Sequence, residues 1–119
     1  MIELKPGVRL TALSPQIGVV LLIANGAWED TLDEWGDGFT APPLVVTSCN
    51  DGAHSRTSLH YRGSAVDLRT KSLPTNTGKR WFVSELRRRL GSTDFDVILE
   101  HLGGVQEHCH LEYQPKGGA

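Results

Sequence analysis

The chain has 119 residues, of which 39% are apolar and 22% charged, and its formal net charge is −2. This length suits one hydrophobic core, so we expect a single domain over residues 1–119 with a loose tail at 114–119. The charge argues against nucleic acid as a partner, because proteins that bind it present strongly basic surfaces. Cys49 and Cys109 are too few for a disulfide framework, and we interpret both as free thiols.

The first apolar segment, 17–24, predicts a helix. It follows Ser14 and Pro15, a pairing typical of an N-cap residue and the first helical position. The segment is too short to cross a membrane, and we find no convincing signal peptide, so the compartment stays open. We therefore predict a helix at 15–28, followed by a loop over the acidic, glycine-rich segment 29–43.

The remaining elements are short strands and one further helix. The elements predicted here are strands at 44–47, 64–68, 95–99 and 108–113 and a helix at 78–90. Gly91 ends that helix, and the last two strands are expected to be neighbours. The segment 50–63 is polar and irregular. This order predicts an α+β fold in which helices back a mostly antiparallel central sheet.

Ionisable side chains gather on one face of two predicted strands. Alternate residues of a strand point to opposite faces, so His108, His110 and Glu112 share a face while Cys109 points into the core. The same alternation gives Asp67 a polar face in its own strand. Side by side, the two strands would bring Asp67 and His110 together. Glu112 could then orient a ligand histidine through its second ring nitrogen.

Two histidines and one carboxylate are a common ligand set for catalytic zinc, which keeps a fourth position for water. His60 can reach Asp67 and His110 from the preceding loop, so we predict one zinc ion per chain held by these three residues. A carboxylate must also accept a proton. Glu107 is the first candidate and is expected in the turn before the last strand, while Glu100 is the second.

Two motifs around these positions resemble a known family. Residues 58–67 match the pattern SxHxxGxAxD in full, and residues 107–110 match its companion ExxH. Together they resemble the zinc peptidases that include D-alanyl-D-alanine carboxypeptidases, D-Ala-D-Ala dipeptidases and phage L-alanyl-D-glutamate endopeptidases. The stretch 51–70 also resembles the signalling domain of hedgehog proteins, which shares that fold and zinc site. The resemblance covers roughly residues 44–115.

The resemblance assigns roles to individual positions. It implies a hedgehog/D-Ala-D-Ala peptidase-like fold, zinc ligands at His60, Asp67 and His110, and a catalytic base at Glu107. His54 matches a histidine that lines the zinc cleft, and we also read His108 as lining the cleft. The run 47–51 lacks the arginine with which many relatives bind a substrate carboxylate. The arginines that could take its place are Arg56, Arg62 and Arg69.

These assignments lead us to expect a monomeric zinc metallopeptidase whose partner is peptidoglycan. It would cut stem peptides, either from a phage particle or at the cell wall. The missing arginine favours cleavage of the L-alanyl-D-glutamate bond over the D-alanyl-D-alanine bond, because an endopeptidase has less need to bind a terminal carboxylate. One alternative is a non-catalytic, hedgehog-like zinc module that binds a protein. A purely structural zinc site is a weaker alternative, because such sites generally have four protein ligands and favour cysteine.

Overall fold

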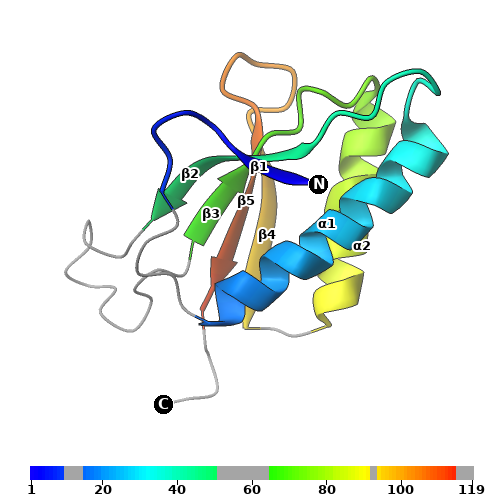
Figure 1. Ribbon diagram of the computed structural model, residues 1–119. Coiled ribbons are helices and arrows are strands. Elements are labelled where there is room, and N and C mark those ends of the chain that lie inside the picture. Colours follow the sequence, from blue (N-terminus) through cyan, green and yellow to red (C-terminus); the bar gives the residue numbers. More distant parts are fainter. Residues whose placement is uncertain (10–14, 51–64, 92–93, 115–119) are drawn as a thin grey trace.

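The computed structural model describes residues 1–9, 15–50, 65–91 and 94–114 (Figure 1). The elements in this part of the chain are β1 (Ile2–Leu4), α1 (Pro15–Trp35), β2 (Leu44–Asn50), β3 (Ala65–Leu68), α2 (Asn76–Leu90), β4 (Phe95–Glu100) and β5 (His108–Tyr113). The strands form one sheet in the order β1-β2-β3-β5-β4. β1 pairs with β2 in parallel and the other pairs are antiparallel, which confirms an α+β fold with a mostly antiparallel sheet.

The two helices pack against each other and cover one face of the sheet (Figure 1). Trp28 of α1 and Phe82 of α2 meet edge to face, with ring centroids 5.2 Å apart. Both are fully buried, and the Trp28 indole Nε1 donates a hydrogen bond to the Pro42 carbonyl. The strand residues packed beneath the helices are Leu44, Val46, Val66, Leu68, Val97, Cys109 and Leu111. The alternate residues of β3 and β5 consequently lie on the opposite face, away from the helices.

The first helix is longer than its sequence predicted. It starts at Pro15 as expected but continues to Trp35, so the loop predicted to begin at residue 29 was wrong. Buried Trp28 and Thr31 and the partly buried Leu32 continue the inward face through the acidic segment. The acidic side chains of that segment point outward, where they do not oppose helix formation.

The second helix and second strand also extend beyond their predicted bounds. α2 begins at Asn76 rather than 78, because the Thr75 side chain accepts a hydrogen bond from the Gly78 amide and caps the helix. Gly91 ends it in the left-handed conformation, with φ of 58°. β2 runs three residues past its predicted end, since its last residues pair with β3. β1 was not predicted.

The other strands match their predictions closely. β5 has the predicted bounds, β4 and β3 each differ by one residue, and β4 and β5 are neighbours as expected. Cys49 and Cys109 do not form a disulfide with each other, and Cys109 lies in the core, where burial raises its pKa to about 12. No helix in the described ranges combines the length and apolar character needed to cross a bilayer.

Candidate metal site

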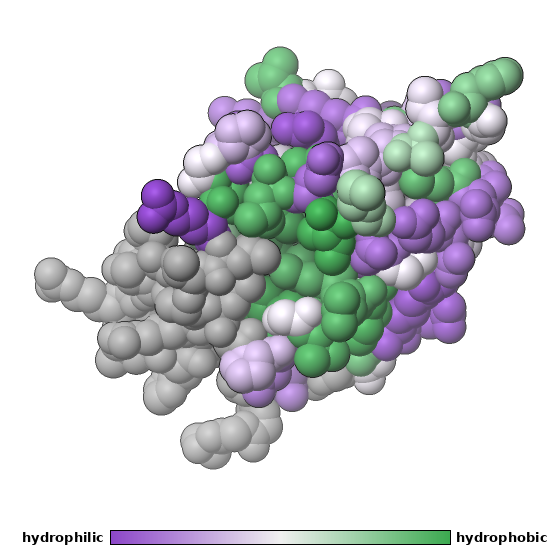
Figure 2. Space-filling view, viewed as in Figure 1, coloured by the Kyte–Doolittle hydropathy of each residue, from purple (hydrophilic) through white to green (hydrophobic). Residues whose placement is uncertain are grey.

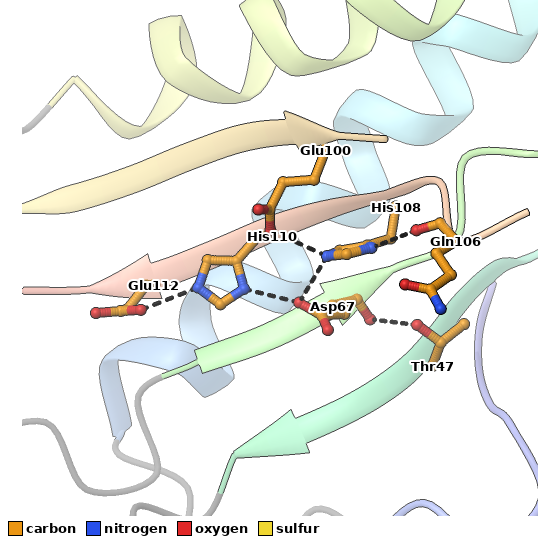
Figure 3. A network of polar contacts seen from close by, with 7 residues as sticks. All are labelled: Thr47, Asp67, Glu100, Gln106, His108, His110 and Glu112. Atoms are coloured by element: carbon orange, nitrogen blue, oxygen red, sulfur yellow. Dashed lines mark hydrogen bonds and ion pairs between the residues drawn. The ribbon is translucent and has the colours of Figure 1, made fainter. Parts of the chain in front are cut away.

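The pairing of β3 with β5 places Asp67 directly opposite His110. Their neighbours Val66 and Leu111 point into the core, so the two polar side chains share the open face of the sheet. The Nδ1 atom of His110 lies 2.7 Å from Oδ1 of Asp67 (Figure 3). The shared polar face predicted from the two alternating patterns is therefore confirmed.

Glu112 holds the other side of the His110 ring. Its Oε1 atom lies 2.9 Å from His110 Nε2, on the side away from Asp67 (Figure 3). A neutral ring that donates from Nε2 to Glu112 keeps an unprotonated Nδ1 facing Asp67. This arrangement of carboxylate and histidine is the one that fixes ring orientation in metal sites, as the sequence suggested for Glu112.

His108 brings a second imidazole to the same place. Its Nδ1 lies 2.8 Å from the Gln106 carbonyl oxygen, which can only accept, so Nδ1 carries a proton. Its Nε2 lies 3.6 Å from Asp67 Oδ1 and 3.1 Å from Glu100 Oε1. A neutral ring with its proton on Nδ1 has a lone pair on Nε2 that can ligate a metal but cannot donate to the Glu100 carboxylate. The sequence placed His108 on this face but did not identify it as a ligand.

Asp67, His108 and His110 could together hold a metal ion, because one ligand atom from each lies within 4.8 Å of the others. Ligand bonds of roughly 2.0–2.2 Å in a tetrahedron place neighbouring ligand atoms roughly 3.3–3.6 Å apart. Asp67 Oδ1 lies 3.6 Å from His108 Nε2, at the upper end of that range, and 2.7 Å from His110 Nδ1, which is closer than that range. Two imidazoles and a carboxylate suit zinc among other divalent metals. The donor set and its spacing therefore fit a metal ion.

The charges of the metal-free cluster favour a proton on the His110 ring, at the position where a metal would bind. The hydrogen bond to Asp67 raises the pKa of His110 to about 9, against the opposing effect of partial burial and with further help from Glu112. The ring is thus protonated at neutral pH when no metal is bound. A metal ion would have to displace that proton, so metal binding and proton release are coupled.

Glu107 lies in the turn just before β5, as expected, but its carboxylate is bonded elsewhere. It accepts hydrogen bonds from the Thr70 hydroxyl at 2.5 Å, the Lys79 ammonium at 2.9 Å and the Gly103 amide at 3.0 Å. Burial alone would raise the pKa of Glu107, but these three donors outweigh it and lower the pKa. Glu100, which is partly exposed, is instead in contact with His108.

Four of the other predicted site residues, His54, Arg56, His60 and Arg62, fall within 51–64 and lie outside the described residues. The third predicted zinc ligand, His60, therefore stays a prediction. Of the three predicted ligands, the structure brings together Asp67 and His110 and adds His108 beside them. The signal for His108 was its position two residues before His110, on the same strand face.

Comparisons with known protein families, curated proteins and solved structures found no match to this chain. The site is therefore interpreted from its own geometry and from the two sequence motifs. These features define an α+β protein with a group of one carboxylate and two imidazoles on the open face of its sheet.

Proposed function

We propose that this chain is a zinc peptidase with a hedgehog/D-Ala-D-Ala peptidase-like fold that hydrolyses peptide bonds in peptidoglycan stem peptides. The observation that carries the proposal is the register pair of Asp67 and His110, with His108 beside it. Residues from both sequence motifs meet in this pair, although they lie 43 positions apart in the chain. Such convergence is expected of a functional site.

The side chains around the cluster have distinct tasks in this proposal. Asp67 and His110 hold the metal, with His60 or His108 as the third ligand, and Glu112 keeps the His110 ring in position. When bound, zinc would supply the Lewis acidity that polarises a peptide carbonyl and acidifies water. His108 and Glu100 form a hydrogen-bonded pair at the edge of the cluster, where a proton can be held.

Two carboxylates compete for the role of catalytic base. Glu107 occupies the matching position of the ExxH motif, but its side chain would have to leave Lys79 and Thr70 to act at the cluster. Glu100 contacts His108 directly and is partly exposed. The contacts favour Glu100 and the motif favours Glu107, so the assignment stays a prediction that paired variants can decide.

The buried ion pair of Glu107 also favours a second candidate function. If Glu107 serves only the fold, the cluster resembles a zinc module that binds a protein partner without catalysis. The two functions differ in one product: a peptidase releases new peptide termini from its substrate, whereas a binding module does not.

The deciding experiment is digestion of purified peptidoglycan from several chemotypes, followed by mass spectrometry of the released termini. We expect cleavage between L-alanine and D-glutamate, lost in Asp67→Asn and kept in Asp33→Asn, a matched change at an exposed position of α1. Release of free D-alanine alone would reassign the bond to D-alanyl-D-alanine. A zinc-loaded protein that releases nothing from any chemotype would support the binding module.

A further inference from the structure

A groove lies between helix α2 and the last strand of the sheet, β4 (Figure 1). Its volume is about 350 Å³, and it is lined from the helix by Arg80, Ser84 and Arg87 and from the strand by Ile98 and Leu99. Within the described part of the chain, no strand pairs with the outer side of β4. The groove therefore runs beside an open edge of the sheet.

The hydrogen bonds of β4 show which backbone groups face this edge. Opposite residues of an antiparallel pair alternate between pairs that exchange backbone hydrogen bonds and pairs that do not. The Gln114 amide donates to the Asp94 carbonyl, which fixes the alternation along the register of β4 with β5. The amides and carbonyls of Val97 and Leu99 then point outward. The Val97 carbonyl agrees, because it accepts bonds of 2.6 and 2.9 Å from the Arg87 guanidinium.

Arg87 occupies only the middle of the edge. Two residues further along β4, the amide and carbonyl of Leu99 face no partner that the described residues provide. An extended peptide can pair with such groups by adding a strand at the usual spacing of about 4.8 Å. Val83, Leu102 and the half-exposed Ile98 line the groove as well and give it an apolar surface. This end of β4 thus offers both backbone and side-chain contacts.

The helix side of the groove carries positive charge. Arg80, Ser84 and Arg87 follow one another at spacings of four and three residues, so they form one stripe along α2. Among the described residues, neither arginine forms an ion pair, and none of those that line the groove is acidic. An acidic side chain of a bound peptide would therefore be attracted to this stripe.

The same charges argue against a second copy of this chain in the groove. Two copies joined through antiparallel β4 strands would be related by a two-fold axis and would form one continuous sheet with both α2 helices on the same face. Arg80 and Arg87 of one copy would then approach those of the other, and like charges at close range repel. An acidic peptide has the opposite, favourable charge.

We propose that the groove between α2 and β4 binds an extended, acidic peptide segment of a partner protein as an additional strand of the sheet. The peptide backbone pairs with Leu99. Because alternate side chains of a strand point to opposite faces, acidic residues reach Arg80 on the helix side while apolar residues contact Ile98 on the open face. The added strand would lie roughly 10 Å from β5, at twice the interstrand spacing. This surface is separate from the metal site and does not depend on the proposed peptidase.

The test is a titration with a synthetic peptide in which glutamate and valine alternate over seven residues, both ends being blocked. The control peptide has lysine in place of glutamate. We expect the glutamate peptide to bind more tightly. At ten times its dissociation constant, hydrogen exchange of the Leu99 amide should slow about tenfold, because only about a tenth of the protein remains free. The Ile98 amide already faces β5 and should exchange at its former rate.

Two variants of α2 test the charge. Arg80→Glu should weaken binding of the glutamate peptide about tenfold and strengthen binding of the lysine peptide, because the sign of the charge is reversed. Arg80→Gln should weaken the glutamate peptide less. Arg88→Gln, at an exposed arginine of α2 outside the groove, should leave both affinities unchanged. Circular dichroism checks that each variant is folded.

Several outcomes would overturn the proposal. Equal affinity for the two peptides would remove the role of charge, and binding without slower exchange at Leu99 would remove the added strand. A dimer of the free protein in sedimentation, with Leu99 already protected, would assign the edge to a second copy. Binding of the glutamate peptide that is lost when zinc is removed would place it at the metal cluster. Binding that is the same with and without zinc supports the groove, whether or not the protein hydrolyses peptidoglycan.

Discussion

Glu107 has both a predicted catalytic role and the contacts of a structural residue. Its side chain is 1% exposed and that of its partner Lys79 is 12% exposed, so the ion pair is almost closed to solvent. The pair ties the turn before β5 to the first turns of α2. A buried ion pair of this kind is costly to break from one side, because the remaining charge stays buried without a partner.

The first prediction concerns this pair. Glu107→Gln and Lys79→Met should each lower the free energy of unfolding by about 2–4 kcal/mol. The double variant should lose clearly less than the sum, because the second change removes a charge that the first left unpaired. Urea denaturation measures all three. Glu29→Gln, at the exposed ion pair with the N-terminal amine, should change little. Additive losses would show that the pair is not coupled.

The lowered pKa of Glu107 gives a second prediction, for acid conditions. A carboxyl group whose pKa falls on folding stabilises the protein above its unfolded pKa and loses that stabilisation as the pH falls through the folded value. The unaltered protein should therefore lose stability progressively as the pH falls below about 4.5, the ordinary pKa of a glutamate side chain. Glu107→Gln cannot titrate, so its unfolding free energy should fall less over that range. Parallel curves for the two proteins would contradict this.

A third prediction separates the two candidate bases by kinetics. Loss of a general base slows the reaction by roughly 10²–10⁴-fold. The contacts lead us to expect this loss in Glu100→Gln with stability unchanged, whereas Glu107→Gln should mainly lose stability. The measurement is peptide release at a temperature where both variants are folded, with zinc content determined in parallel. If the Glu107→Gln protein is stable and binds zinc but has lost its turnover, Glu107 of the ExxH motif is the base.

At the level of elements, the first turn of α2 packs tightly against the last turn of α1. A Cβ atom added at Gly78 would lie 2.8 Å from Cβ of Trp35 and 3.1 Å from the Thr75 hydroxyl oxygen. Such contacts are too short for either helix to keep its position. Gly78 is thus a point of close approach, unlike Gly18, an exposed residue of the first turn of α1 that has open space around it.

The fourth prediction compares these two glycines. Gly78→Ala should destabilise the protein by about 1–3 kcal/mol, because overpacking outweighs the gain in helix propensity. Gly18→Ala has no such clash and should stabilise it by roughly 0.5–1 kcal/mol. Thermal unfolding followed by circular dichroism measures both. Stabilisation by both substitutions would mean that the helices can separate at this contact without cost.

Prediction from the sequence was most accurate for elements whose structure is decided by the pattern of polar and apolar residues within the element itself. β5 has six residues with strict alternation, and its bounds and polar face were both foreseen. β1 has three residues, too few to show a period, and exists because it pairs with β2. The end of α1 was missed because acidic residues hid the inward spacing of Trp28, Thr31 and Leu32. The ion pair of Glu107 with Lys79 depends on a contact across 28 positions, which no local pattern encodes.

On the scale of the whole molecule, the proposed metal joins two strands that are far apart in sequence. The cluster lies on β3 and β5 at the middle of the sheet, where both strands also contribute to the core. A metal bound there would bridge elements that separate on unfolding. An unfolded chain does not hold the three ligands together, so binding energy would add to the stability of the fold.

The final prediction is that zinc stabilises the protein and that the cluster is responsible. At a hundredfold excess over the dissociation constant, zinc should add about 2.7 kcal/mol to the unfolding free energy, a rise in Tm on the order of 10 °C. Asp67→Asn and His110→Gln should abolish the zinc-dependent rise, and each should unfold below the metal-free Tm of the unaltered protein because the charged Asp67–His110 hydrogen bond is lost. Asp33→Asn should respond normally.

The same titration identifies the third ligand. If His108 ligates the metal, His108→Gln should weaken zinc binding as strongly as His110→Gln, and His60→Gln should not. If His60 ligates, as the motif implies, the effects reverse: His60→Gln should weaken zinc binding strongly and His108→Gln should not. Metal content measured on each purified variant checks the result independently of Tm. A zinc-dependent rise that survives in Asp67→Asn would place the metal outside the cluster, because Asp67 is the residue that both imidazoles share.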